Sequence, residues 1–218
     1  MARPFWSAVT RGEWNVCAAE LRGYLASRIL RPRIALLWLL LVAATALIAA
    51  DGLSELPWRA LACALFIAAF RLWDDLADLD FDRLHHPQRV LAKATNLACF
   101  HFVLGAMLAL LIGWIALWVG GARALSLLLL MVAFWVLYQI DHARPLQRNW
   151  RSALVLVKYP VWVLLLAPHP IGARTVLSAM VVFVVLVLDE MRGSGGAVLR
   201  PVAVLLVVAI IAWFILQN

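Results

Sequence analysis

The sequence predicts an all-α integral membrane protein, a bundle of about seven transmembrane helices whose N-terminus lies in the cytoplasm. The composition is the first reason: the 218 residues are 66% hydrophobic and 14% charged, and the mean hydropathy is +0.93. The second is that apolar runs of about twenty residues, the length of a bilayer crossing, recur along the chain. The third is an uneven distribution of basic residues between the connections, which sets the orientation.

Seven apolar segments are candidates for transmembrane spans. We expect them at about 33–50, 57–73, 96–118, 122–140, 152–167, 174–189 and 200–217. No Pro/Ser-rich linker divides them, which predicts one transmembrane domain over 33–218.

The first 32 residues are expected to form a separate N-terminal region. Trp14, Cys17, Leu21 and Leu25 recur at helical spacing among charged residues, and the segment lacks the continuous apolar core of a signal peptide. This pattern predicts an interfacial helix that leads into the first span. The three cysteines, Cys17, Cys63 and Cys99, have no metal-ligand spacing, and we expect all three to be reduced packing residues.

Basic residues are concentrated in the connections that face the cytoplasm when the N-terminus lies inside. The opposite connections carry only Arg59, Arg123 and Arg174. This asymmetry indicates the orientation, and we expect a multi-pass protein of the bacterial inner (cytoplasmic) membrane. The net charge of +7 is then explained by topology and by contact with anionic membrane lipids, and no nucleic-acid-binding module accompanies it.

The segment 74–82 carries the strongest functional signal, because it places five aspartates directly after an apolar run. On a helix Asp75, Asp78 and Asp82 fall at i, i+3 and i+7, and Asp74 lies four residues before Asp78. These four carboxylates share one face, whereas Asp80 points elsewhere. Mg²⁺ suits such a set, since it takes carboxylate oxygens and completes its shell with water and substrate phosphates.

Basic residues follow the aspartates and suit the phosphates of a diphosphate. They are Arg83, His85, His86, Arg89 and Lys93. Arginine would give charge-assisted, bidentate hydrogen bonds to phosphate oxygens on the side opposite the metal. The alternative is an acidic helix end followed by a solvated basic loop.

Two further cytoplasmic connections offer polar residues. The first contains Arg144 and Arg148, and Lys158 lies about 10 Å deeper than Arg151 along the next helix. Lys158 either extends back to the interface along its aliphatic stem or points into the bundle as a phosphate ligand.

The third cytoplasmic connection begins with Asp189 and Glu190, two acids at the C-terminal end of an apolar span. Because the helix dipole disfavours acids there, they are candidates for a second metal-ligand site.

These residues resemble the UbiA-type intramembrane prenyltransferase superfamily. The first signature of that family is an Asn/Asp-Asp pair, two residues, Asp, three residues, Asp, and an Arg shortly after. Asp74, Asp75, Asp78, Asp82 and Arg89 match it, and Arg31-Pro32 and Lys158-Tyr159-Pro160 are weaker echoes.

The resemblance implies a UbiA-like helical arrangement and Mg²⁺ held against an isoprenyl diphosphate, with the lipid tail in an apolar tunnel. Asp75, Asp78 and Asp82 would be the catalytic metal ligands. Further metal ligands would be Asp74, Asp189 and Glu190; diphosphate ligands would be Arg89, Lys158, Arg144 and Arg148.

The chain departs from the family in two respects. The family usually has nine spans, and the positions four after Asp189 and Glu190 are Gly193 and Ser194 rather than acids.

The leading hypothesis is a Mg²⁺-dependent transferase of alkyl groups other than methyl. It would move an isoprenyl group from the diphosphate to a small-molecule or lipid acceptor, left open among aromatic acids, quinone precursors, haem, sugars and lipids. A membrane terpene cyclase of the same family is an alternative. A non-catalytic protein that binds a prenyl phosphate or an anionic lipid is another, motivated by the reduced second motif. A divalent-cation transporter is less favoured, because no acid lies alone at mid-membrane.

Overall fold

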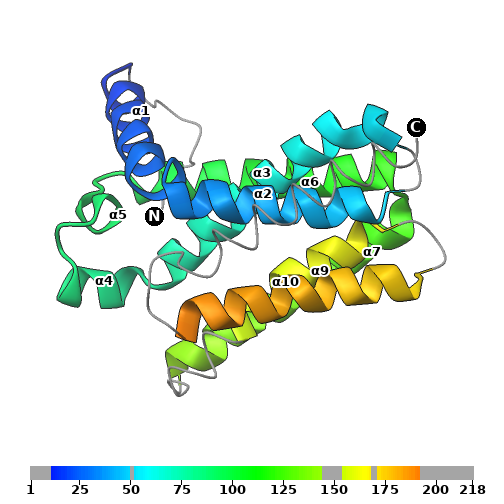
Figure 1. Ribbon diagram of the computed structural model, residues 1–218. Coiled ribbons are helices and arrows are strands. Elements are labelled where there is room, and N and C mark those ends of the chain that lie inside the picture. Colours follow the sequence, from blue (N-terminus) through cyan, green and yellow to red (C-terminus); the bar gives the residue numbers. More distant parts are fainter. Residues whose placement is uncertain (1–10, 50–51, 144–153, 168–170, 192–218) are drawn as a thin grey trace. The chain divides into compact units, whose positions relative to one another are not determined.

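The computed structural model describes residues 11–49, 52–143, 154–167 and 171–191, and within these ranges every regular element is a helix (Figure 1). The elements are α1 (Arg11–Tyr24), the π-helix η1 (Leu25–Ile29), α2 (Pro32–Leu47), the 3₁₀-helix η2 (Gly52–Glu55), α3 (Leu56–Ala77), α4 (Leu79–His85), α5 (Val90–Lys93), α6 (Leu97–Trp118), α7 (Gly121–Ala143), α9 (Lys158–Leu165) and α10 (Ala173–Met191). The all-α prediction is therefore confirmed for the described part of the chain.

Six of the seven predicted spans coincide with helices, and the seventh, 200–217, lies outside the described residues. They are α2, α3, α6, α7, α9 and α10. By length and composition, two described helices can cross a membrane, Leu97–Trp118 and Gly121–Asp141. A third is added if the bent pair Trp14–Ile29 and Pro32–Leu47 is one span. Seven crossings are thus not confirmed.

Short helices explain part of the difference from the predicted seven crossings. At 1.5 Å per residue, the 16 residues of α2 extend about 24 Å, and the apolar helix Leu154–Leu165, which includes α9, about 18 Å. The hydrocarbon core of a bilayer is about 30 Å thick, so neither helix spans it alone.

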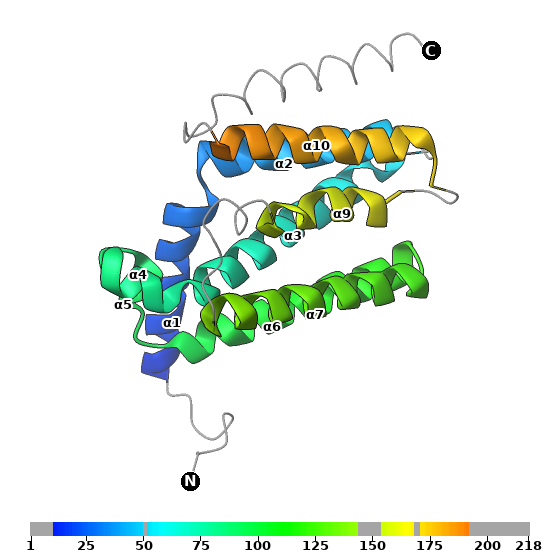
Figure 2. The same cartoon turned by 90° about the horizontal axis from the view of Figure 1, so that it is seen from below.

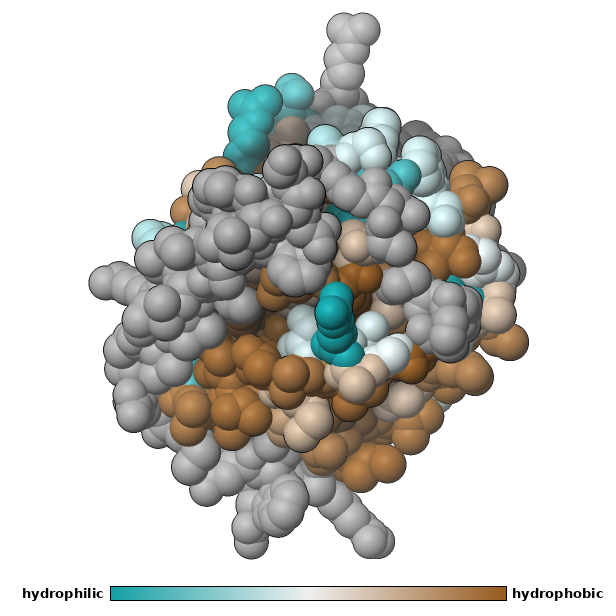
Figure 3. Space-filling model, turned by 45° about the vertical axis from the view of Figure 1, so that its right-hand side comes forward, coloured by the Kyte–Doolittle hydropathy of each residue, from teal (hydrophilic) through white to brown (hydrophobic). Residues whose placement is uncertain are grey.

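Large apolar side chains are exposed along the two longest apolar helices. Figure 3 shows a face on which brown, apolar residues cover much of the surface that is not grey. In α6 and α7 the exposed residues include Leu110, Leu117, Leu125, Leu129 and Trp135, which are 52% exposed or more. Such a surface is unfavourable in water and is compatible with a membrane protein.

The described chain divides into two compact units. The first comprises residues 11–31 and 68–109. Its core packs Tyr24 against Leu72, Leu91, Phe100 and Leu104. The rings of Tyr24 and Phe100 meet edge to face, 5.8 Å between centroids.

Two contacts attach α1 to the start of α6 in this first unit. Glu20 accepts hydrogen bonds from the backbone N–H of Thr95 at 2.8 Å, from its hydroxyl at 2.8 Å and from Asn96 N at 3.4 Å. Cys17 and Cys99 form a disulfide, with Cα atoms 6.2 Å apart. The expectation of three reduced cysteines is wrong for this pair, whereas Cys63 is free and buried. The reason is tertiary, because helix packing brings together two residues 82 apart in sequence.

The second unit comprises the described residues of 32–67 and of 110–191. Within it α10 lies beside α2 and α9 (Figures 1 and 2). Trp162 of α9 stacks on Phe66 of α3 at 4.3 Å between centroids and donates a hydrogen bond to Cys63 Sγ.

Two of the arginines that the positive-inside rule left on the opposite side bind backbone carbonyls near the C-terminal end of α9. Arg59 Nη1 donates to Leu166 O at 2.9 Å, and Arg123 donates to Leu164 O and Ala167 O. The last carbonyls of a helix lack intrahelical partners and must be satisfied in an apolar environment. These arginines therefore have a structural role in the second unit.

Candidate functional site

The aspartate segment lies at the junction of α3 and α4. α3 ends at Ala77, and Asp78 (φ −89°, ψ 6°) precedes α4. Hydrogen bonds from Asp78 N to Asp74 O (3.0 Å) and from Asp82 N to Asp78 O (2.9 Å) keep the four-residue helical spacing through the junction. The helical spacing predicted for the aspartates is thus largely retained across the junction.

Burial of the aspartates follows the predicted phase. Asp75 and Asp82 are buried, and Asp74 and Asp78 are partly buried. The Asp80 side chain is 75% exposed and lies 3.8 Å from Arg83. The prediction that Asp80 points away from the other four is confirmed.

Asp75 is surrounded by donors from three helical elements, α1, η1 and its own helix α3. Arg28 holds it in a bidentate contact, Nε to Oδ2 at 2.9 Å and Nη2 to Oδ1. The Tyr24 hydroxyl donates to Oδ2 at 2.9 Å, and Arg71 Nη2 lies 3.5 Å from Oδ1.

The environment of Asp75, which follows the predicted span 57–73, favours its charged form. Burial on its own would raise the pKa of this carboxyl. The hydrogen bond from Arg28, the nearby charges of Arg71 and Arg28 and the hydrogen bond from Tyr24 outweigh burial and hold the pKa below its usual range.

Asp82 and Arg89, the last two members of the predicted motif, bind each other directly. Arg89 Nη1 donates to Asp82 Oδ1 at 2.5 Å, and the Asp82 side chain is 4% exposed. The chain between them turns back after α4, where His86 N donates to Asp82 O and Arg89 N to His86 O. The aspartates and the predicted phosphate-binding arginine therefore belong to one local structure.

The described residues contain no group of three or more His, Cys, Asp or Glu side chains placed to hold a metal ion together. The carboxylates of Asp75 and Asp82 are bound by arginines instead. Their oxygen chemistry fits Mg²⁺, which needs one or two protein carboxylates besides water and phosphate. Their present geometry does not present a metal-ligand set.

The predicted second motif is bound by an arginine in a similar way. In the second unit Arg33, at the start of α2, reaches Asp189 Oδ2 (Nε at 3.1 Å, Nη2 at 2.9 Å) and Glu190 Oε2 (3.2 Å). The Asp189 side chain is 1% exposed. Its Oδ1 has no hydrogen-bond partner within the described ranges.

Lys158 is fully buried in the second unit. Its Nζ lies 5.6 Å from the centroid of the Phe134 ring and 5.5 Å from that of Tyr159, both within cation–π distance. The side chain therefore points into the protein and does not extend to the interface. Arg144 and Arg148 lie outside the described residues.

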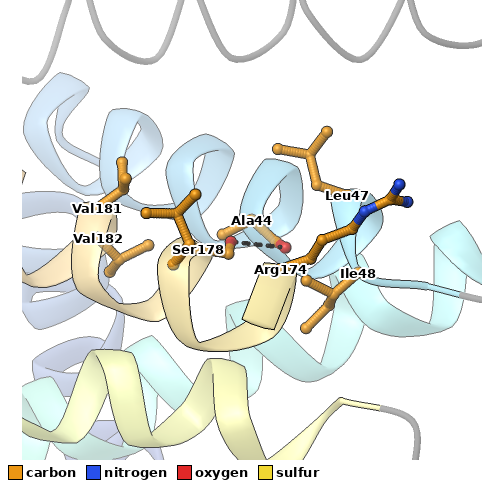
Figure 4. Close-up of a pocket in the computed structure, with 8 residues that line it drawn as sticks. Ala44, Leu47, Ile48, Arg174, Ser178, Val181 and Val182 are labelled. Atoms are coloured by element: carbon orange, nitrogen blue, oxygen red, sulfur yellow. Dashed lines mark hydrogen bonds between the residues drawn. The ribbon is translucent and has the colours of Figure 1, made fainter. Parts of the chain in front are cut away.

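An apolar cavity of about 340 Å³ lies between α2 and α10 in the second unit (Figure 4). Its walls are aliphatic, and the polar groups on its lining are Arg174 and Ser178. Ser178 Oγ donates to Ala44 O at 3.2 Å, the dashed line in Figure 4. A cavity of this lining suits an apolar chain better than a charged group.

Sequence reasoning missed Tyr24, Arg28 and Arg33 as partners of the acidic residues. Arg28 is 47 residues from Asp75, and Arg33 is 156 residues from Asp189. The signal present in the sequence was weak: two arginines flank Arg31-Pro32, where the chain enters its first span.

Comparisons with protein-family models, with curated protein sequences and with solved structures found no match to this chain. The resemblance to the UbiA-type superfamily therefore rests on the residues of the aspartate segment.

Proposed function

We propose that the protein is a Mg²⁺-dependent intramembrane transferase that moves an isoprenyl group from an isoprenyl diphosphate to an acceptor. The observation that carries this proposal is the aspartate segment, whose Asp75 and Asp82 are buried and whose Asp82 is bonded to Arg89. Ionisable residues within membrane proteins are rare and costly, which makes this segment a candidate functional site.

In this proposal the aspartates hold the cation and Arg89 binds the diphosphate. Mg²⁺, when bound, would stabilise the negative charge that develops on the departing diphosphate. Arg89 would turn from Asp82 to a phosphate oxygen, since a guanidinium binds carboxylate and phosphate with the same geometry. The bond that breaks joins the allylic carbon to the diphosphate oxygen, and the acceptor supplies the electron pair of the new bond.

The roles of the remaining predicted residues rest on the sequence pattern. They are Asp189 and Glu190 as metal ligands, and Lys158, Arg144 and Arg148 as diphosphate ligands. The seven-span arrangement with a cytoplasmic N-terminus, in a bacterial inner membrane, belongs to the same proposal.

Pyrophosphate release tests the proposed transferase. Purified protein in lipid nanodiscs is given an isoprenyl diphosphate of ten, fifteen or twenty carbons together with a membrane lipid extract as acceptor source. We expect pyrophosphate release that requires Mg²⁺, falls at least about a hundredfold in Asp78→Ala and is unchanged in Asp80→Asn. Release without Mg²⁺, or full activity in Asp78→Ala, would contradict the proposal.

A second candidate function is non-catalytic binding of a prenyl phosphate or an anionic lipid. The observation that favours it is that Asp75 and Asp82 are each neutralised by an arginine. In that case labelled prenyl phosphate binds to the protein, yet no pyrophosphate appears over many hours with any of the three chain lengths.

A further inference from the structure

The donors around Asp75 come from three side chains, Tyr24, Arg28 and Arg71. Oδ2 accepts from the Tyr24 hydroxyl and from Arg28 Nε, both at 2.9 Å. Oδ1 is in contact with Arg28 Nη2 and lies 3.5 Å from Arg71 Nη2. Two guanidinium groups and a phenol therefore converge on one carboxylate.

One donor of this group remains unused. Arg71 Nε is buried and has no hydrogen-bond partner within the described part of the chain. Leaving a buried donor unsatisfied costs about 1–3 kcal/mol in general. A carboxylate offers two oxygens, whereas a phosphate offers three with tetrahedral spread, so a phosphate can satisfy more donors from the same position.

We propose that Tyr24, Arg28 and Arg71 form a binding site for phosphate oxygens, the anion cradle, which the carboxylate of Asp75 occupies until a phosphate ligand takes its place. Under the proposed function, on which this choice of ligand rests, the phosphate is that of the isoprenyl diphosphate. Arg28 and Tyr24 are then binding residues in addition to Arg89.

The anion cradle is held in position before any ligand arrives. The Tyr24 residue is 2% exposed, and its ring packs against Phe100. The segment that carries Tyr24 and Arg28 is attached to the start of α6 by Glu20 and by the Cys17–Cys99 disulfide. Arg71 lies one helical turn before Asp75 on α3. Groups fixed in this way lose little conformational entropy when they bind.

The anion cradle is also reachable. The side chains of Arg28 and Arg71 are 20% and 33% exposed, whereas that of Asp75 is 7% exposed. The two arginine side chains are therefore more accessible to a ligand than the carboxylate is.

The test measures binding of inorganic pyrophosphate to the full-length protein in detergent by calorimetry, once with EDTA and once with Mg²⁺. Asp75→Asn keeps the side-chain shape but removes the competing charge. We expect it to bind pyrophosphate at least about tenfold more tightly than wild type in EDTA, since the released arginines can make charge-assisted hydrogen bonds. Adding Arg28→Ala to Asp75→Asn should abolish this gain.

Asp80→Asn is the matched control, because it removes the same charge from the same segment at an exposed position. Arg31→Ala controls for the loss of an arginine, since Arg31 is exposed and its Nε donates to Ser27 O of its own segment. Neither control should change pyrophosphate affinity in EDTA by more than about twofold. Equal affinity of Asp75→Asn and Asp80→Asn would overturn the anion cradle.

A second set of variants covers the case in which Asp75→Asn does not fold. Tyr24→Phe keeps the ring contact and removes the hydroxyl. Arg71→Lys keeps the charge and removes the planar guanidinium with its paired N–H donors. Each should weaken Mg²⁺-dependent pyrophosphate binding at least about fivefold. Unchanged binding in both would reject the anion cradle.

The two proposals fail in different ways. If Asp75→Asn gains affinity in EDTA but wild type never releases pyrophosphate from an isoprenyl diphosphate, the anion cradle stands and the transferase does not. If wild type is an active transferase and Asp75→Asn gains nothing, the transferase stands and the anion cradle does not.

Discussion

At the scale of single residues, each acidic motif of this chain is bound by an arginine distant in sequence. Arg28 binds Asp75, and Arg33 binds Asp189 and Glu190. The two side chains of the Arg33–Asp189 pair differ in exposure: that of Arg33 is 48% exposed and that of Asp189 is 1% exposed. Loss of this ion pair would therefore cost free energy mainly at Asp189, because a buried carboxylate without a counter-charge is unfavourable.

Arg33→Ala should destabilise the protein by about 2 kcal/mol, because it removes the Arg33 guanidinium from the buried Asp189 carboxylate. Unfolding in mixed SDS–detergent micelles, followed by tryptophan fluorescence, gives the free energy. Adding Asp189→Asn to Arg33→Ala should recover most of the loss, since it removes the charge in question. A double variant as unstable as Arg33→Ala would show that the ion pair is not the cause.

At the scale of elements, the sequence predicted the features that depend on residues close together in the chain. Helical periodicity separated Asp80 from Asp74, Asp75, Asp78 and Asp82, and apolar runs located six helices. Both signals lie within a few turns of chain. The partners of the aspartates could not be found in this way, because the contact between Arg28 and Asp75 depends on how α1 and η1 pack on α3. The disulfide between Cys17 and Cys99 also depends on helix packing, and local spacing could not predict it.

The attachment of α1 to α6 is tested by counting thiols. Protein purified without reductant and then denatured should react with one equivalent of a maleimide, at Cys63, and with three after reduction. The disulfide closes a long loop, and opening such a loop costs about 3–5 kcal/mol in the chain-entropy account. Cys17→Ser should therefore unfold at lower denaturant than Cys63→Ser does. Three reactive thiols before reduction would contradict the bridge.

At the scale of the whole molecule, the open question is how many helices cross the membrane. Two described helices, α6 and α7, satisfy length and composition together. Other helices fail either the length or the composition criterion. The helices α2 and α9 are short, and α10 carries Arg174, Asp189 and Glu190 near its ends. Ion pairs such as Arg33 with Asp189 reduce the cost of charges in apolar surroundings, which hydropathy counted residue by residue does not include.

Labelling of single cysteines decides the crossing of α6 and the orientation of the chain together. Asp80→Cys and Gly121→Cys are placed in a background in which the three native cysteines are serine. Both sites are exposed, and a Cβ at Gly121 meets no other atom within 4 Å. If α6 crosses the bilayer and the positive-inside rule holds, a membrane-impermeant maleimide added to intact bacterial cells labels Gly121→Cys and spares Asp80→Cys. Opening the cells should then label both. Labelling of both sites in intact cells would place them on one side and remove α6 as a crossing. Labelling of Asp80→Cys alone would keep the crossing and invert the orientation, which would put the aspartate segment outside the cytoplasm.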